Sequence, residues 1–216
     1  MLTVGAPGGP DGTTSPQALD VIVLAGGTAR RLGGVRKPDV VARGARLIDH
    51  VLAGLEGLRP ALALGRVVVV APQEVALPDG VLRALEDPPL GGPVAGVGAG
   101  LLALRQAGPA PVTALLTCDA PEAWRALPPL AARLAQEPRA AGAVNADGEH
   151  RQYLVGVYRS AALGEAVAPQ GVPLRDVAVR RTLGALAPLE VDLGALRTAG
   201  RDLDTWQEVA AWERGG

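Results

Sequence analysis

The sequence contains no phenylalanine, only one cysteine and only two histidines. Aromatic residues make up 2% of the chain, so the core must be built from leucine, valine and alanine. The single Cys118 excludes an intramolecular disulfide and a zinc site made of several cysteines, and a lone thiol fits a reducing, cytoplasmic compartment. With only His50 and His150 present, neither a histidine-rich metal site nor a histidine general base is expected.

Long apolar runs and a strong excess of one charge are also missing. No stretch of about 18 apolar residues occurs, so no membrane-spanning helix is expected. The net charge is −1 and acidic and basic residues are interspersed, which argues against a nucleic-acid-binding surface and a membrane-binding basic patch. Residues 1–17 lack the basic and apolar regions of a signal peptide, and their Gly, Pro, Ser and Thr content predicts a flexible tail over residues 1–18.

Short apolar runs alternate with longer helical patterns along the 216 residues. This alternation predicts one α/β domain over residues 19–214, with a mostly parallel, Rossmann-like sheet covered by helices on both faces in three α/β/α layers. The predicted strands are Asp20–Leu24, Arg66–Val70, Val81–Leu85, Val112–Cys118, Ala140–Asn145, Gln152–Tyr158 and Ala187–Val191. The predicted helices are Arg46–Leu58, Val94–Gln106, Glu122–Gln136, Ala161–Val167, Pro173–Leu183 and Trp206–Arg214.

The most informative segment follows the first predicted strand. Gly26–Lys37 contains two glycine pairs, three arginines and a lysine. Glycines let a backbone approach a ligand closely, and arginine and lysine bind phosphate groups. In sheets of this kind ligands bind outside the carboxyl ends of the strands, where Asp87 and Asp119 are also expected. The segment therefore predicts a site for a polyphosphate.

Two common phosphate-binding loops do not fit this segment. A P-loop needs a lysine directly after glycine and then serine or threonine, whereas Gly34 is followed by Val35, Arg36, Lys37 and Pro38. No alignment of the segment supplies the three glycines of a G-x-G-x-x-G dinucleotide turn. The alternative to a phosphate site is a glycine-rich turn whose basic residues are solvated.

The string Leu24-Ala25-Gly26-Gly27, followed by Arg31-Leu32-Gly33 and Lys37, resembles a nucleotidyltransferase signature, L-A-G-G-x-x-x-R-[ML]-G-x-x-x-K. Enzymes with this signature have the nucleotide-diphospho-sugar transferase fold, and the form present here looks most like that of the molybdenum cofactor guanylyltransferases. The resemblance implies that this loop binds a nucleoside triphosphate and that Arg31 and Lys37 take part in catalysis. The cationic side chains of Arg31 and Lys37 suit this reaction, because positive charge must offset the negative charge of the triphosphate. The implied nucleotide-binding residues are Leu24, Ala25, Gly26, Gly27, Arg31 and Lys37.

Asp119 directly follows the predicted strand Val112–Cys118. Cys118-Asp119-Ala120-Pro121 resembles the C-D-x-P element of the same family, whose aspartate binds Mg²⁺. Mg²⁺ is usually held by one or two carboxylates together with substrate phosphates, so a carboxylate facing a phosphate loop suits it. The resemblance implies that Asp119 is a catalytic, metal-binding residue. The alternative is a turn residue close to a proline.

Asp87 stands a few residues before Gly92-Pro93-Val94-Ala95-Gly96. This arrangement resembles a family segment in which an aspartate before G-P-[LI]-A-G contributes to nucleotide binding, so Asp87 joins the implied nucleotide site. A proline-rich turn is the alternative. The small residues Gly96 and Gly100 allow the predicted helix to lie close to a ligand or to a neighbouring strand.

Two further stretches resemble the family less closely. Asp202-Leu203-Asp204-Thr205 resembles N/D-x-N/D-T-P, from which an acidic or amide side chain can join the metal shell, although Thr205 fits a helix N-cap equally well. The stretch Gln152–Arg159 resembles Q-P-L-x-x-x-Y-R, which lines the acceptor side, with Tyr153 in place of the proline. His150, beside it, reads as a surface histidine on a turn.

Taken together, the resemblance implies a Mg²⁺-dependent nucleotidyltransferase. The phosphate of a molybdopterin-type acceptor would attack the α-phosphorus of GTP and release pyrophosphate, in a protein that is a monomer or small homo-oligomer and binds neither nucleic acid nor membranes. Two alternatives stay open: transfer from CTP or ATP to a sugar-, polyol- or cofactor-phosphate, and a non-catalytic nucleotide-binding homologue. The departures from the family pattern are Arg36, Pro38 and Ala71-Pro72, the last standing where guanylyltransferases often carry an asparagine.

Overall fold

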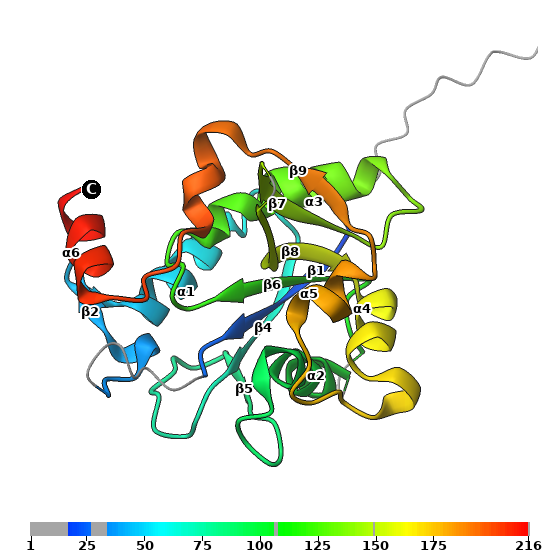
Figure 1. Ribbon diagram of the computed structural model, residues 1–216, viewed down its shortest axis with the longest axis horizontal. Helices are drawn as coiled ribbons and strands as arrows, with labels where there is room; N and C mark the ends of the chain where they lie inside the picture. Colours follow the sequence, from blue (N-terminus) through cyan, green and yellow to red (C-terminus); the bar gives the residue numbers. More distant parts are fainter. Residues whose placement is uncertain (1–16, 27–33, 106–107, 149, 216) are drawn as a thin grey trace, which may run out of the picture.

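The computed structural model describes residues 17–26, 34–105, 108–148 and 150–215. Its centre is a seven-stranded sheet (Figure 1). The strands, in spatial order, are β5 (Leu82–Ala84), β4 (Leu64–Val70), β1 (Leu19–Leu24), β6 (Val112–Thr117), β8 (His150–Arg159), β7 (Gly142–Asp147) and β9 (Leu189–Val191). All neighbouring pairs are parallel except that β8 is antiparallel to both β6 and β7. The predicted mostly parallel sheet is confirmed.

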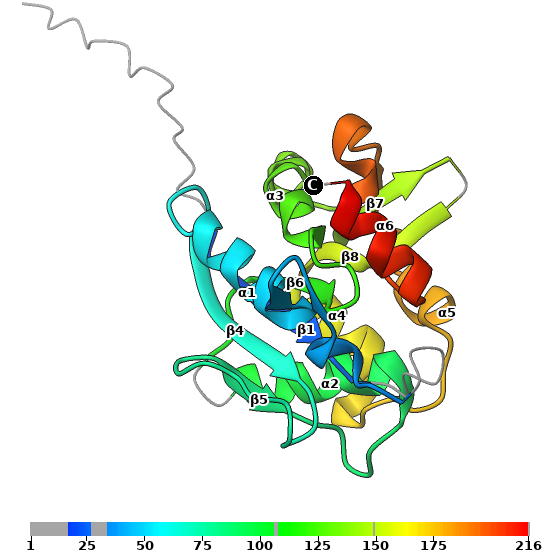
Figure 2. The ribbon, with the colours of Figure 1, turned by 90° about the vertical axis from the view of Figure 1, so that its left-hand side faces the viewer.

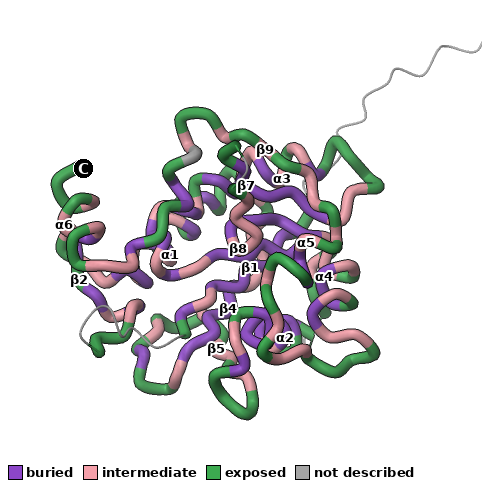
Figure 3. Tube along the Cα trace, viewed as in Figure 1, coloured by how far each residue is buried: buried purple, intermediate pink, exposed green. Residues whose placement is uncertain are grey.

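Helices cover both faces of the sheet, because side chains alternate in direction along each strand. On β1, Val21 and Val23 pack into the core on one face, and Ile22 packs into the core on the other. The views in Figures 1 and 2 agree in placing α3 and α2 on opposite sides of β1 and β6, and the strands between the layers are largely buried (Figure 3). The first layer contains α1 (Leu47–Leu58) and α3 (Leu127–Gln136), and the second contains α2 (Gly92–Arg105), α4 (Ser160–Val167) and α5 (Val179–Gly184). This is the predicted three-layer arrangement.

The contact between α2 and β1 is unusually close. A Cβ atom on Gly100 would lie 2.7 Å from Cγ2 of Ile22, and one on Gly96 would lie 3.2 Å from Cδ2 of Leu24. Only glycine fits the first position without displacing the buried side chain of Ile22. The predicted approach of this helix to a neighbouring strand is therefore confirmed, and it brings the start of α2 to the end of β1.

The C-terminal helix α6 (Trp206–Arg214) packs away from the sheet, against a short hairpin of β2 (Val41–Ala42) and β3 (Ala45–Arg46) (Figure 1). Thr205 caps it as predicted, because its hydroxyl accepts a hydrogen bond from the amide of Glu208 and its own amide donates to the Glu208 carboxylate. Leu203 and Val209 are buried in a small cluster with the hairpin. This cluster fixes the segment that precedes α6.

The predicted strands and most predicted helices are confirmed with shifts of a few residues at their ends. Of the predicted helix Glu122–Gln136, only Leu127–Gln136 is α-helical, because Ala123–Ala126 forms a 3-10 helix. The prediction of a helix over Pro173–Leu183 was wrong for its first half, since only Val179–Gly184 is helical. The backbone there makes other hydrogen bonds: Leu174 N donates to Val167 O and Asp176 N donates to Gly91 O. The β2–β3 hairpin was not predicted. The 3-10 helices are η2 (Lys37–Asp39), η3 (Ala123–Ala126), η4 (Pro169–Gly171) and η5 (Gly194–Gly200).

Most of the predicted tail, residues 1–16, lies outside the described residues. Among the described helices, none is long and apolar enough to cross a membrane.

Candidate active site

The ends of β4, β1 and β6 meet at one edge of the sheet. Ala25 N donates to Val70 O and Cys118 N donates to Leu24 O, both at 2.9 Å. These bonds hold the start of the glycine-rich loop between the two neighbouring strands. As a result Gly26, which follows β1, lies near Asp119, which follows β6, as expected for parallel strands.

Lys37 connects three segments that are far apart in the sequence. Its ammonium group donates to Oδ2 of Asp119 at 2.5 Å and also to Oδ1 of Asp204. Burial lowers the pKa of Lys37, but the hydrogen bonds and charges of the two carboxylates outweigh that effect, so its pKa lies above the ordinary value. Lys37 is therefore a permanent positive charge at neutral pH.

The acidic residues around Lys37 do not have all of their hydrogen-bonding capacity satisfied. Oδ1 of Asp119 is buried and has no hydrogen-bond partner among the described residues. A buried acceptor without a partner is unfavourable, so this oxygen is disposed to bind a cation or a donor. Asp202 lies close by, and burial of part of its surface, together with the charges of Asp119 and Asp204, raises the pKa of its carboxyl to about 6.

Two cavities open beside Asp119. The first, of about 400 Å³, lies between the start of the glycine-rich loop and the beginning of α2. The second, of about 460 Å³, extends along β8 toward α5. Thr117, Asp119 and Leu154 line both cavities. A group bound in one cavity can therefore meet a group bound in the other at Asp119.

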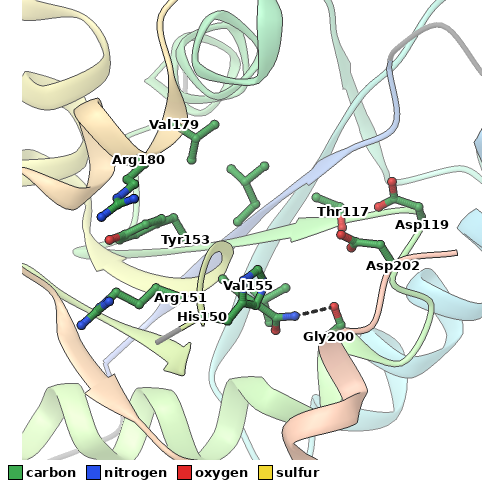
Figure 4. Close-up of a pocket in the computed structure, with 12 residues that line it drawn as sticks. Thr117, Asp119, His150, Arg151, Tyr153, Val155, Val179, Arg180, Gly200 and Asp202 are labelled. Atoms are coloured by element: carbon green, nitrogen blue, oxygen red, sulfur yellow. Dashed lines mark hydrogen bonds between the residues drawn. The ribbon is translucent and has the colours of Figure 1, made fainter. Parts of the chain in front are cut away.

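The second cavity is rich in polar side chains (Figure 4). Asp119, Asp202 and Thr117 lie at one end, and Tyr153 and Arg180 lie at the other. Gln152, also in its wall, is held by donating to Gly200 O at 2.9 Å and accepting from Asn145 at 2.6 Å. Arg180 was not predicted, because no motif in the sequence marks it. Its only signal was an adjacent arginine pair at the start of a helix.

The predicted site residues divide into three groups. Lys37 and Asp119 are hydrogen-bonded to each other, and Leu24 and Gly26 line the first cavity beside Asp119. Ala25 is buried and positions the loop through its backbone. Gly27 and Arg31 lie outside the described residues.

Asp87 lies apart from these groups. It is exposed and is not among the residues that line the first cavity, whereas its neighbour Glu86 is. Glu86 was not predicted, because the resemblance pointed to the aspartate beside it. His150 lies at the start of β8 and lines the second cavity.

The family model for the MobA-like NTP transferase domain matches residues 21–202. This chain belongs to the MobA-like NTP transferase family. The family transfers nucleotidyl groups from nucleoside triphosphates, so nucleotidyl transfer is the class of reaction that this MobA-like domain represents. No curated protein matches the sequence at a significant level.

Solved structures similar to this MobA-like domain include molybdopterin-guanine dinucleotide biosynthesis protein A from Archaeoglobus fulgidus, at 21% identity with a TM-score of 0.62 over 90% of this chain and 97% of that one. A homologue of the Mycobacterium tuberculosis protein rv0371c, from Mycobacterium sp. strain JC1, aligns at 20% identity with a TM-score of 0.65 over 91% and 96%. The 2-C-methyl-D-erythritol 4-phosphate cytidylyltransferase from Thermus thermophilus aligns at 17% identity with a TM-score of 0.57 over 89% and 96%. These similarities establish the nucleotide-diphospho-sugar transferase fold.

Proposed function

We propose that the protein transfers GMP from GTP to the phosphate of a molybdopterin-type acceptor and releases pyrophosphate. The observation that carries the proposal is that Asp119 and Thr117 line both cavities. GTP bound in the first cavity has its α-phosphate at this junction, and the acceptor phosphate reaches the junction from the second cavity. The similar Archaeoglobus fulgidus protein is named for molybdopterin-guanine dinucleotide biosynthesis, which supports this choice of nucleotide and acceptor.

The reaction requires no nucleophile from the protein. An oxygen of the acceptor phosphate, already an anion, attacks the α-phosphorus, and the bond from that phosphorus to the bridging oxygen of the β-phosphate breaks. Negative charge accumulates on the departing pyrophosphate. Lys37 stabilises this charge, because its ammonium remains protonated and is hydrogen-bonded to Asp119, which lies at the junction. Arg31, on the same loop by sequence, is proposed as the second phosphate-binding cation, and the backbone of Leu24, Ala25, Gly26 and Gly27 as the cradle.

The carboxylates fit a Mg²⁺ ion. The unpartnered Oδ1 of Asp119 is the principal proposed ligand, and Asp202 and Asp204 are close enough to Lys37 and Asp119 to interact with them. These residues do not form a preassembled cluster of three metal ligands within the described part of the chain. That agrees with the usual mode of Mg²⁺ binding, in which one or two carboxylates act together with substrate phosphates and water. When bound, Mg²⁺ polarises the phosphoryl oxygens of the triphosphate.

The second cavity suits an anionic acceptor with a flat part. Arg151 and Arg180 contribute positive charge to its wall, although Arg151 also pairs with Glu190 at 2.5 Å. Arg180 makes no hydrogen bond or ion pair with the described residues. Tyr153 adds an aromatic surface beside it (Figure 4).

The alternative is transfer from CTP or ATP to another phosphate-bearing acceptor. The structural similarity to a cytidylyltransferase supports it, and so does the apolar Ala71 at a position where guanylyltransferases often carry an asparagine.

The test is a pyrophosphate-release assay with each nucleoside triphosphate, Mg²⁺ and molybdopterin, paired with thermal unfolding. Release only with GTP, and a higher melting temperature with GTP than with CTP or ATP, is the expected result. Turnover with CTP and a polyol phosphate would favour the alternative. Stabilisation by none of the nucleotides would refute every enzymatic proposal.

A further inference from the structure

Strand β8 carries a large bulge beside the second cavity. Val144 and Asn145 are adjacent on β7. Their partners on β8 are Gly156 and Gln152, which are separated by three residues. In the register that the structure describes, β8 pairs with β6 from its far end up to Gly156. Residues 153–155 therefore leave the regular ladder, and a bulge of this kind turns side chains in a new direction.

The bulge forms part of the walls of both cavities. Tyr153 and Val155 line the second cavity (Figure 4), and Leu154, between them, lines both. The Tyr153 ring packs against the end of α5, where a Cβ atom on Gly184 would lie 3.2 Å from the tyrosine hydroxyl oxygen. The shape of the second cavity therefore depends on where residues 153–155 are held.

The side chain of Tyr158 holds the bulge in place. Its hydroxyl donates to Tyr153 O at 2.7 Å. Five residues of regular strand span about 16 Å, at about 3.3 Å per residue, which is far beyond the length of a tyrosine side chain. The bond can form because the bulge shortens this path. Tyr153 has no partner on β7 in the described register, and the hydroxyl supplies a donor to its carbonyl.

Two glycines make room for the Tyr158 ring, which is fully buried. A Cβ atom on Gly142, its partner on β7, would lie 2.5 Å from Cδ1 of the ring, and one on Gly156 would lie 2.8 Å from Cε2. Without these side chains the ring can lie close to both strands and reach Tyr153. Tyr158 also belongs to the core that packs α2, α4 and α5 against the sheet, so its hydroxyl projects from a well-packed part of the fold.

We propose that Tyr158 is a positioning residue for the acceptor, an inference that rests on the proposed nucleotidyl transfer. Tyr158 lines neither cavity at the site, so it acts through Tyr153, whose ring and backbone form the wall beside the acceptor. A wall that is fixed before binding does not have to be ordered when the acceptor arrives, which increases the affinity for the acceptor. The hydroxyl of Tyr158 thus serves the acceptor and not the nucleotide.

The test compares Tyr158→Phe, which removes only the hydroxyl, with the control Thr113→Val. Thr113 is the partner of Tyr158 on β6 and is equally buried, and its hydroxyl forms a hydrogen bond with that of Ser160 at 2.8 Å. The control therefore removes a buried hydroxyl from the same part of the sheet without changing a contact of the bulge. Both variants should lose some thermal stability, because each leaves a buried polar group without its partner.

Initial rates with GTP, Mg²⁺ and varied molybdopterin should give an acceptor KM that is raised about tenfold in Tyr158→Phe and unchanged in Thr113→Val, as the loss of one buried hydrogen bond predicts. The GTP dissociation constant, measured by calorimetry, should be the same in the natural protein and in both variants. Amide hydrogen exchange without substrates should become faster at residues 153–155 in Tyr158→Phe alone, because the bond no longer opposes local opening of the bulge.

An unchanged acceptor KM in Tyr158→Phe, or unchanged exchange at residues 153–155, would overturn the proposal. Equal increases of KM in the two variants would also overturn it, since lost stability alone would then explain them, and so would weaker GTP binding in Tyr158→Phe. If the natural protein uses another phosphate-bearing acceptor, that acceptor replaces molybdopterin in the same comparison. Absence of turnover with every acceptor in the natural protein would refute the proposed function itself.

Discussion

Lys37 and Asp119 are hydrogen-bonded to each other, with 2.5 Å between Nζ and Oδ2, although they belong to different segments 82 residues apart. The proposed function gives the ammonium to the triphosphate and the carboxylate to Mg²⁺. Each group thus balances the charge of the other, and Asp204 adds a second carboxylate to the same ammonium. The charges at this junction are coupled, so a change in one alters the others.

Replacing Lys37 with glutamine should weaken GTP binding about tenfold or more, because a neutral amide cannot offset the phosphate charge. Lys37→Arg keeps the positive charge and should lose less of the affinity for GTP. Calorimetric titration with GTP and Mg²⁺ measures both. Equal GTP affinity in the natural protein and in Lys37→Gln would contradict a role of Lys37 in phosphate binding.

Asp119→Asn should reduce the rate of pyrophosphate release about 100-fold or more, because removing one charged group from such a site commonly has an effect of this size. The amide keeps the shape of the carboxylate and can still accept from Lys37, so the melting temperature should change little. The control is Asp79→Asn, an exposed aspartate outside both cavities of the site. Full Mg²⁺-dependent turnover in Asp119→Asn would refute the metal-binding assignment.

The sequence predicts the sheet well, because buried parallel strands appear as short apolar runs. β1, β4 and β6 are such runs, and the residues at their ends are brought together by the sheet itself. The closeness of Gly26 to Asp119 could therefore be expected from topology alone. The bond from Lys37 to Asp204 could not, since it depends on where the cluster around Leu203 anchors the segment before α6.

Loop conformation accounts for the rest of what the sequence did not reveal. Glu86 and Asp87 are adjacent acids, and only the path of the chain after β5 decides which of them lines the cavity. Similarly, the segment 173–178 has a helical pattern but uses its amides in hydrogen bonds to Val167 and Gly91. Such tertiary hydrogen bonds override a local preference and leave no periodic signal in the sequence.

Asp202 should make the stability of the protein depend on pH. Its carboxyl has a pKa of about 6 in the folded protein and an ordinary value of 3.8, so the folded state binds the proton more tightly than the unfolded state. The free energy of unfolding therefore falls as the pH rises from about 4 through 6. Asp202→Asn removes this contribution. Its melting temperature, measured in EDTA, should exceed that of the natural protein by more at pH 8 than at pH 4. The same difference at both pH values would contradict the shifted pKa, and Asp79→Asn is expected to show no such pH dependence.

Gly100→Ala should destabilise the fold by about 1–3 kcal/mol, because the added methyl group would lie 2.7 Å from the side chain of Ile22, which is fully buried and would have to shift. The matched control is Gly57→Ala in α1, where a Cβ meets no atom within 4 Å. That substitution should be neutral or stabilise by about 0.4–1 kcal/mol. Chemical denaturation of both variants gives their free energies of unfolding. Equal values would mean that the close packing of α2 on β1 contributes nothing to the stability of the fold.

Arg180→Ala should raise the KM for the acceptor while leaving the GTP dissociation constant unchanged. Arg180 lines only the second cavity, where its guanidinium forms no ion pair with the described residues, so an anionic group of the acceptor is its natural partner. Arg181→Ala is the matched control, because it removes the same charge from the same helix at a position outside that cavity.

Initial rates at varied acceptor concentration, together with GTP titration, separate the effects on the two substrates. An increase of about tenfold in KM for Arg180→Ala alone is expected from the loss of one charge-assisted contact. Equal effects of the two variants would show that only the overall charge of α5 matters. Weaker GTP binding in Arg180→Ala would instead place the nucleotide, rather than the acceptor, in the second cavity.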